Sequence, residues 1–381
     1  MPQGKSNTRE IRKINRSIVF QFLYRHPHIT KQELALGCDL SMPTVSLNLA
    51  DLQRMGLLET SGVKDSTGGR RARLLSVNPS ARYALGVNVT AHHITCVLLN
   101  LYGQMICRER ISIAFSNSQA YMQVLADLLR SLIHSQGIDR EHILGVGLSM
   151  PAIISKDGES LAYASVLNFT DGRLQDFSVP IGLPCRFIND ATAGGFAELW
   201  HNPIFSQAGS PEAVVYLSLN NSVGGAFFIS GREYAGENQR ASEFGHISLY
   251  AGGRQCYCGK LGCADAYLRA LNLSDLCDGS LTAFFEQLRQ NNQEAENLWR
   301  QYCVDLARCV NTLRMAYDCQ IIVGGSVGEH LAPYLTQLRA QAAALNTFEN
   351  DGSYLHVSTD KLENSAAGAA LMWISDFTHI V

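Results

Sequence analysis

Apolar residues recur at helical spacing in three segments near the start of the chain, which predicts three consecutive helices. The first segment stops at a His-Pro pair and keeps its apolar residues on one face: Ile11, Ile14, Ile18, Val19, Phe22 and Leu23. Thr30 and Glu33 form a capping box for a short second helix, which ends at Gly37. The third segment follows directly, so the three helices belong to one small domain.

Ser41 stands as the N-cap of the third helix, whose packed face is predicted to hold Val45, Leu49 and Leu52. Two helices joined by a turn of about four residues form a helix-turn-helix pattern, in which the later helix reads DNA. Short polar side chains on its outward face suit base edges and phosphates. The predicted DNA contacts on this helix are Ser41, Thr44, Ser46 and Asn48.

Two alternating segments, 57–60 and 73–77, predict a β-hairpin after the third helix. Their connection contains Gly68-Gly69-Arg70-Arg71. A flexible glycine pair followed by two arginines can enter a narrow minor groove, where negative potential is concentrated. Arg70 and Arg71 are therefore predicted DNA contacts at the tip of a wing. The alternative is a three-helix module for protein contacts with a solvated basic loop.

Beyond residue 83 buried strands and amphipathic helices alternate, which predicts an α/β body with mostly buried sheets. Strands are expected at 85–89, 94–99, 143–148, 185–188, 214–219, 224–229 and 321–325. Helices are expected at 120–135 and 298–317.

Charge is distributed unevenly between the two parts. Residues 1–78 hold 12 Lys and Arg against 6 Asp and Glu, a net charge of +6, which leaves −9 for the rest because the whole chain carries −3. A basic head on an acidic body favours double-stranded DNA as the partner of the head. The first residues, MPQGKSNTREIRK, are polar and lack the apolar run of a signal peptide, and no stretch approaches the roughly 18 apolar residues of a membrane span. A cytoplasmic protein without membrane contact is therefore expected.

Several motifs of the body occur in the order typical of one family. The most specific are E-F-G-H at 243–246 and C-Y-C-G-K-L-G-C at 256–263, supported by Asn189-Asp190, Gly324-Gly325 and the alanine-rich run at 366–370. Over essentially its whole length the chain resembles the ROK family (repressors, open reading frames and sugar kinases), within the actin-like ATPase superfamily. The head makes it similar to the NagC/XylR-type sugar-responsive transcriptional repressors.

The resemblance implies a fold of three parts. Residues 1–78 would form a winged helix-turn-helix domain. The two-lobed actin-like body would consist of a smaller lobe, 79–190 plus 360–381, and a larger lobe, 191–359, which would carry a zinc site and a dimerisation surface.

Three of the 11 cysteines are clustered, and a histidine stands ten residues before the first of them. An odd number of cysteines without a signal peptide argues against a disulfide framework. Zinc favours a tetrahedron of three thiolates and one imidazole, and four protein ligands make a closed, structural site. The resemblance assigns one structural zinc ion per chain to His246, Cys256, Cys258 and Cys263.

Sugar hydroxyls require dense, fixed hydrogen-bond donors and acceptors. The resemblance to ROK sugar kinases implies sugar contacts at Asn168, Asn189, Asp190, Glu243, His246 and Asp265. Asp265 stands where the kinases carry glutamate, so its side chain is one methylene shorter. The effector is expected to be a sugar or a sugar phosphate.

Both phosphate loops of the family's kinases are altered in this chain. The first loop, D-x-G-G-T in kinases, reads N-V-T-A-H at 88–92, and the second, G-T-G-x-G-G-G, reads N-N-S-V-G-G-A at 220–226. Lost glycines and a lost acid leave transition-state charge unsupported, so no enzymatic activity and no catalytic residue are expected. His92 and His93 receive no role. The alternatives are an active kinase with Asp190 as general base, and a regulator controlled by a protein partner.

The sequence therefore predicts a DNA-binding repressor of carbohydrate-metabolism genes that binds a sugar or sugar phosphate without phosphoryl transfer. A homodimer or homotetramer that binds a pseudo-palindromic operator is expected, because helix-turn-helix dimers bind paired half-sites.

Overall fold

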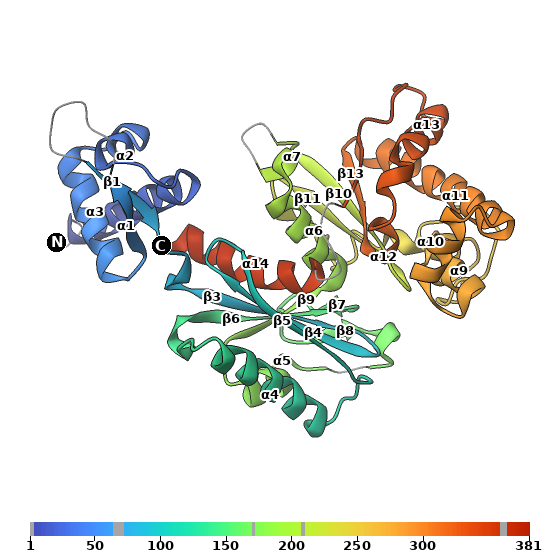
Figure 1. Ribbon diagram of the computed structural model, residues 1–381, viewed down its shortest axis with the longest axis horizontal. Helices are drawn as coiled ribbons and strands as arrows, with labels where there is room; N and C mark the ends of the chain where they lie inside the picture. Colours follow the sequence, from blue (N-terminus) through green and yellow to red (C-terminus); the bar gives the residue numbers. More distant parts are fainter. Residues whose placement is uncertain (1–3, 64–71, 170–171, 207–209, 359–363) are drawn as a thin grey trace.

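The chain forms a small head and two larger lobes, which are joined by the C-terminal helix (Figure 1). The computed structural model describes residues 4–63, 72–169, 172–206, 210–358 and 364–381, and each structural statement below concerns these residues. In Figure 1 the head, in blue, lies next to the C-terminal end of α14 (Asn364–Ile380), in red.

The head consists of three helices and an antiparallel hairpin: α1 (Gly4–Arg25), α2 (Lys31–Gly37), α3 (Met42–Arg54), β1 (Leu58–Val63) and β2 (Arg73–Val77). Thr30 and Glu33 form the capping box of α2, and Ser41 Oγ accepts the N–H of Thr44 at 3.3 Å. The predicted helices and hairpin are thus confirmed. Arg70 and Arg71, at the predicted wing tip, lie outside the described residues.

Two parts of the predicted packing in the head are wrong. Ile11, Ile14 and Ile18 were expected on the packed face of the first helix, but their side chains are 51%, 55% and 41% exposed. The head covers the last turns of α1, where Val19, Phe20 and Leu23 are fully buried. The earlier turns contact α3 through the polar side chain of Arg12, so periodicity alone overstated the length of the apolar packed face.

Asn48 is the second correction, because it does not lie on the outward face of α3. Its side chain is 1% exposed and its Nδ2 donates to the carbonyl oxygen of Thr44 at 2.9 Å. Position 48 is three residues after Val45 and four before Leu52, so it lies at the edge of the same buried stripe. Ser41, Thr44 and Ser46 retain at least partial exposure.

A buried carboxylate ties α3 to α1. Asp51, 6% exposed, accepts hydrogen bonds from Arg12 at 2.6–2.9 Å and also pairs with Arg54. The hydrogen bonds from Arg12 are the main reason that the pKa of Asp51 is lowered, although burial opposes them. Because the pKa of Asp51 is lower in the folded state, its ionisation stabilises the fold at any pH above the pKa of the unfolded state. This stabilisation is lost as the pH falls through the pKa of the folded state.

We therefore expect Asp51→Asn to destabilise the head by roughly 1–2 kcal/mol at pH 7. The difference from wild type should disappear as the pH falls through the lowered folded-state pKa of Asp51, because the wild-type carboxylate is then itself protonated. Hydrogen exchange of the amides of α1 and α3 measures the stability of the head separately from that of the body. Asp39→Asn, at an exposed position, is the control; equal protection in Asp51→Asn and the control at pH 7 would contradict the prediction.

The first lobe is built on a sheet with strand order β5-β4-β3-β6-β9. β3, β6 and β9 are mutually parallel, and β4 pairs antiparallel with both β3 and β5. Helices α4 and α5 cover one face of the sheet and α14 covers the other. The elements are β3 (Tyr83–Val89), β4 (His93–Asn100), β5 (Met105–Ser112), α4 (Gln119–Ser135), β6 (Ile143–Met150), the small hairpin β7 (Ile153–Ile154) and β8 (Leu161–Tyr163), α5 (Leu174–Ile181) and β9 (Cys185–Asn189).

Glycines let α14 lie directly on this sheet. A Cβ on Gly86 would lie 1.8 Å from the oxygen of Ala366, and one on Gly147 would lie 2.3 Å from the oxygen of Ala369. Gly368 of α14 makes the same kind of approach to Ala193 of α6 (Asp190–His201), at 1.7 Å. These contacts are with backbone atoms, so no side chain could move aside to admit a methyl group.

The second lobe is built on a sheet with strand order β12-β11-β10-β13-β14, which has α6 on one face and α10, α11 and α13 on the other. Its strands are β10 (Ala213–Leu219), β11 (Val223–Ile229), β12 (Arg232–Glu233), β13 (Gln320–Gly324) and β14 (Leu355–Val357). Its remaining helices are α7 (Pro203–Ser206), α8 (Asp265–Leu268), α9 (Leu271–Ser274), α10 (Leu281–Arg289), α11 (Gln293–Tyr317), α12 (Gly325–Gly328) and α13 (Leu335–Leu345).

The C-terminal end of α14 and the residue after it contact the head. Phe377 packs edge-on against Phe20 of α1, with ring centroids 6.4 Å apart. Arg16 Nε donates to the backbone oxygen of Val381 at 2.7 Å. Helix α14 thus extends from between the two lobes to the head, which is the predicted DNA-binding domain. Among the described residues, no helix is long and apolar enough to cross a membrane.

Candidate metal centre and interlobe clefts

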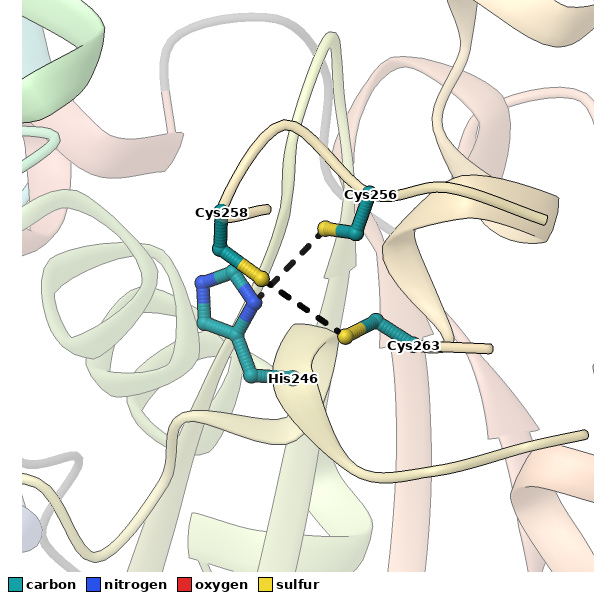
Figure 2. Close-up of side chains that lie close together, drawn as sticks. All are labelled: His246, Cys256, Cys258 and Cys263. Carbon is teal, nitrogen blue, oxygen red and sulfur yellow. Dashed lines mark hydrogen bonds between the residues drawn. The ribbon is translucent and has the colours of Figure 1, made fainter. Parts of the chain in front are cut away.

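Four side chains of the second lobe converge on one point (Figure 2). One potential ligand atom from each of His246, Cys256, Cys258 and Cys263 lies within 4.8 Å of all the others. The sulfurs of Cys258 and Cys263 are 3.7 Å apart, and Cys256 Sγ lies 3.9 Å from His246 Nδ1. A tetrahedral ion with metal–sulfur bonds of about 2.3 Å requires ligand separations of roughly 3.8 Å. The spacing therefore fits a single metal ion and is far too long for a disulfide.

Glycines shape the loop that carries the cysteines. Gly259 and Gly262 both have φ +83°, a conformation that L residues rarely adopt. Gly262 also lies against Tyr250, whose carbonyl oxygen would be 1.7 Å from an added Cβ. The loop closes through the N–H of Cys256, which donates to the oxygen of Lys260 at 2.8 Å. The chain therefore returns on itself and brings its three thiols together.

His246 presents its two ring nitrogens to different neighbours. Nδ1 faces Cys256, and Nε2 lies 3.2 Å from the hydroxyl of Tyr257. A metal on Nδ1 would leave Nε2 as a hydrogen-bonding group directed away from the ion. Tyr257 stands between the first two cysteines and is 49% exposed. The sequence argument did not single it out, although its position inside the C-x-C motif was a usable signal.

The first cleft lies between the lobes and has a volume of about 310 Å³. Two of the predicted sugar contacts, Asn189 and Glu243, line it. Asn189 caps α6: its Oδ1 accepts the N–H groups of Ala191 and Thr192 at 2.9 and 3.1 Å, and its Nδ2 donates to the oxygen of Ala152 at 3.1 Å. One amide hydrogen of Asn189 therefore remains for a ligand. Glu233, which the sequence argument missed, also lines this cleft.

Asp190 lines a second cleft, of about 360 Å³. Burial raises the pKa of its carboxyl to about 6, the nearby charge of Glu243 adds to the increase, and a hydrogen bond from the Ala191 N–H opposes it. Asn189 and Asp190 are adjacent in the chain, so the two clefts adjoin at the start of α6.

The wall of the second cleft includes residues of the two altered loops and the first residues of α12 and α14. Asn220 is tied into this wall: its Oδ1 accepts the N–H of Ser326 at 2.8 Å and its Nδ2 donates to Ser218 Oγ at 3.0 Å. In the first loop, Asn88 Oδ1 accepts a hydrogen bond from Ser149 Oγ at 3.3 Å. The side chains of Asn220 and Asn88 thus accept hydrogen bonds from Ser326 and Ser149, whereas glycines at these positions would leave those donors free to bind a ligand.

Three predicted sugar contacts line neither cleft: Asn168, His246 and Asp265. Asp265 is 1% exposed, and its Oδ1 accepts the N–H of Val223 at 2.7 Å. Burial raises the pKa of this carboxyl. Asp265 therefore supports the 220–226 loop from behind in this structure. Asn168 adopts φ +49° at the end of a short 3-10 turn.

Comparison with known proteins identifies similar sequences and folds. The profile described as "ROK family" matches residues 84–376. A putative xylose repressor of Caldicellulosiruptor sp. is 26% identical over 78% of this chain and 74% of its own length. The DNA-binding transcriptional dual regulator NagC of Escherichia coli is 21% identical over 67% of this chain, and the match spans 62% of its own length, less than two thirds.

Solved structures share the fold. A ROK family transcriptional regulator described as a homolog of the E. coli MLC protein covers 97% of this chain and 98% of its own, with a TM-score of 0.77 at 16% identity. A ROK family glucokinase from Streptomyces griseus, solved with glucose and AMPPNP, covers 76% of this chain and 98% of its own, with a TM-score of 0.63 at 20% identity.

Proposed function

The chain belongs to the ROK family, and on this premise we propose that it is a DNA-binding transcriptional repressor of carbohydrate-metabolism genes. Its effector would be a sugar or sugar phosphate held between the lobes without phosphoryl transfer. One observation carries this proposal: the fold match to a ROK regulator covers 97% of the chain, whereas the glucokinase match covers 76%. The repressor relatives point the same way.

The proposed domain division places the winged helix-turn-helix domain at 1–78, a smaller lobe at 79–190 plus 360–381, and a larger lobe at 191–359. On α3, Ser41, Thr44 and Ser46 remain proposed DNA contacts, and Asn48 is withdrawn because it is buried. Arg70 and Arg71 remain proposed contacts of the wing with the minor groove.

Replacing Arg70 and Arg71 together with alanine is expected to weaken operator binding by roughly tenfold or more at physiological salt. Two fewer phosphate or groove contacts should also reduce the slope of log affinity against log salt by about 2. Operator sequences would be selected from random duplexes with wild-type protein, and affinities measured by fluorescence anisotropy across a salt series. Arg232→Ala, on exposed β12 of the body, removes one positive charge outside the head and is the control; equal affinities and slopes for the two variants would exclude the wing from DNA binding.

The cluster of His246 and the three cysteines would hold one structural zinc ion, since three thiolates and one imidazole at this spacing are ligands that zinc prefers. Zinc would supply a fixed fourfold crosslink for the loop and no open coordination position. Because Nε2 of His246 is directed away from the cluster, the ion would also fix the orientation of a group available to the sugar.

For the sugar itself, Asn189 and Glu243 are the best-supported contacts, because both line the first cleft. Asp190 at the junction of the clefts would act as a ligand rather than a catalytic base. The absence of turnover is supported by the engaged side chain of Asn220 and by the loss of the loop glycines. An active sugar kinase is the alternative. The pKa of about 6 would suit the carboxyl of Asp190 to proton transfer near neutral pH.

Coupling between sugar and DNA would run through α14. Asn364 and Ser365 line the second cleft, Met372 lines the first, and Phe377 packs against the head. Lobe closure that shifts α14 would therefore change the position of the head. In a homodimer or homotetramer this would alter the spacing of two heads relative to paired half-sites, and sugar and operator affinities must change reciprocally.

One experiment tests the whole proposal. Selected operator DNA would be bound to the full-length protein, and a panel of sugars and sugar phosphates would be added while anisotropy and ATP consumption are followed in parallel. A ligand that changes operator affinity without ATP consumption is the expected result. Steady ATP consumption with a hexose would favour the kinase, and no response to any sugar would favour control by a protein partner.

A further inference from the structure

Three side chains that carry or can accept positive charge meet at the second cleft. His92 lies in the turn between β3 and β4, His93 is the first residue of β4, and Arg110 lies on β5; all three line the cleft. Strand alternation explains the placement of Arg110, because it is paired with Thr95, which also lines the cleft. The neighbouring Glu109 is paired with Cys96, whose side chain belongs to the core on the opposite face. We call His92, His93 and Arg110 the cationic corner.

The cationic corner has no acidic partner among the described residues. None of its three side chains forms a hydrogen bond or an ion pair there. Thr90 Oγ1 accepts the backbone N–H of His93 at 3.0 Å, which holds the turn in place. The pKa of His93 is lowered by burial and then by the charges of Arg110 and His92. The three groups therefore face one another, and an anion at this point would relieve their repulsion.

Other residues of the cleft limit the amount of negative charge it can accept. Asp190 and Glu329 line the same cleft, and the remaining wall includes neutral donors such as Asn221, Ser222 and Ser365. Two carboxylates disfavour a metal-free triphosphate, which carries about four negative charges. A single phosphate group, with a charge of about −2, matches the cationic corner better than a triphosphate does.

We infer that the cationic corner binds the phosphate group of a phosphorylated small molecule without a metal ion. The guanidinium of Arg110 would donate to two phosphate oxygens, and the imidazoles would donate to a third. This deepens the proposed function, on which it rests, because it assigns the effector to the sugar phosphates. The two clefts adjoin at Asn189 and Asp190, so the sugar hydroxyls of one ligand would face the first cleft while its phosphate occupies the second.

Titration calorimetry on the full-length protein, in buffer without added divalent metal, tests this inference with four probes. Glucose, glucose 6-phosphate and inorganic phosphate are titrated in that buffer, and ATP is titrated in the same buffer after magnesium is added. Glucose 6-phosphate, inorganic phosphate or both are expected to bind, and Arg110→Gln should weaken that binding by roughly tenfold or more, as expected for loss of a charge-assisted hydrogen bond. Adding His93→Gln to Arg110→Gln, which gives the double variant, should weaken phosphate binding further. Arg108→Gln, two residues away on β5, removes the same charge outside the cleft and should leave affinity within about twofold.

The outcomes separate this inference from the proposed function. Glucose 6-phosphate binding about tenfold or more tighter than either glucose or phosphate supports one ligand that spans both clefts. Phosphate binding as tightly as glucose 6-phosphate, and lost in Arg110→Gln, supports the anion site with the sugar held elsewhere. Binding that is unchanged in the double variant, or that requires magnesium, overturns the inference. A neutral sugar that releases DNA while no phosphate compound binds also overturns it and leaves the repressor proposal intact.

Discussion

Cys263→Ser is expected to abolish stoichiometric zinc binding and to lower the free energy of unfolding of the second lobe by at least about 3 kcal/mol. Cys263 is 4% exposed, and its sulfur lies 3.7 Å from that of Cys258, so a serine would leave the other ligands with one position unfilled. Because the ion would crosslink all four ligands of the loop and its flank, its loss should loosen the loop although the backbone hydrogen bonds remain. Metal content by mass spectrometry and thermal melting measure the two effects.

Cys277→Ser is the matched control, since Cys277 is a half-buried thiol of the same lobe outside the cluster. It should retain one zinc ion per chain and melt within a few degrees of wild type. Sugar binding by Cys263→Ser provides a separate readout, because an unfixed His246 would no longer hold Nε2 in place. Wild-type protein that contains no bound metal after expression in zinc-supplemented medium, and that melts like Cys263→Ser, would contradict the prediction.

Gly147→Ala is expected to destabilise the first lobe by about 3 kcal/mol, near the upper limit for overpacking by one methyl group. The added Cβ would lie 2.3 Å from the backbone oxygen and 2.6 Å from the carbonyl carbon of Ala369 in α14. Relief requires α14 to move away from the sheet, and α14 also packs on α6 and on the head. Chemical denaturation measures the loss of stability, and operator affinity measures the consequence for the head.

Gly137→Ala separates the steric effect from the general cost of replacing glycine. A Cβ at Gly137 would meet nothing within 4 Å, so the only penalty is its φ of +62°, about 1 kcal/mol. If Gly147→Ala were no less stable than Gly137→Ala, α14 would be free to shift on the sheet. The close packing of α14 on the sheet, on which the proposed coupling between sugar and DNA depends, would then be wrong.

The elements that bury a continuous apolar face could be predicted from the chain. The helix expected at 120–135 is α4 (Gln119–Ser135), and the strand expected at 143–148 is β6 (Ile143–Met150). The strand β5 (Met105–Ser112) was missed, because it is an edge strand with mostly exposed side chains and its pattern lacks a buried face. Its partner is the backbone of β4, which leaves no signal in the side chains.

Among the candidate site residues, the metal cluster was recognisable because its ligands lie close together in the sequence, between positions 246 and 263, and glycines close the loop. The sugar contacts were harder, since they come from several distant elements. Asp265 lies behind a loop rather than in a cleft, and Arg110 carried no motif at all.

Sequence alone determined the local features of this protein: capped helices, the cysteine loop, the loss of the phosphate-loop glycines, and the motifs of the ROK family. These depend on neighbouring residues, whose spacing along the chain fixes which side chains can meet. The tertiary structure decided which face each residue presents and which distant groups share a cleft. It buried Asn48, exposed Ile11 and Ile14, and placed Arg110 beside His93. Such relations depend on how sheets and helices pack, and spacing along the chain carries no record of that packing.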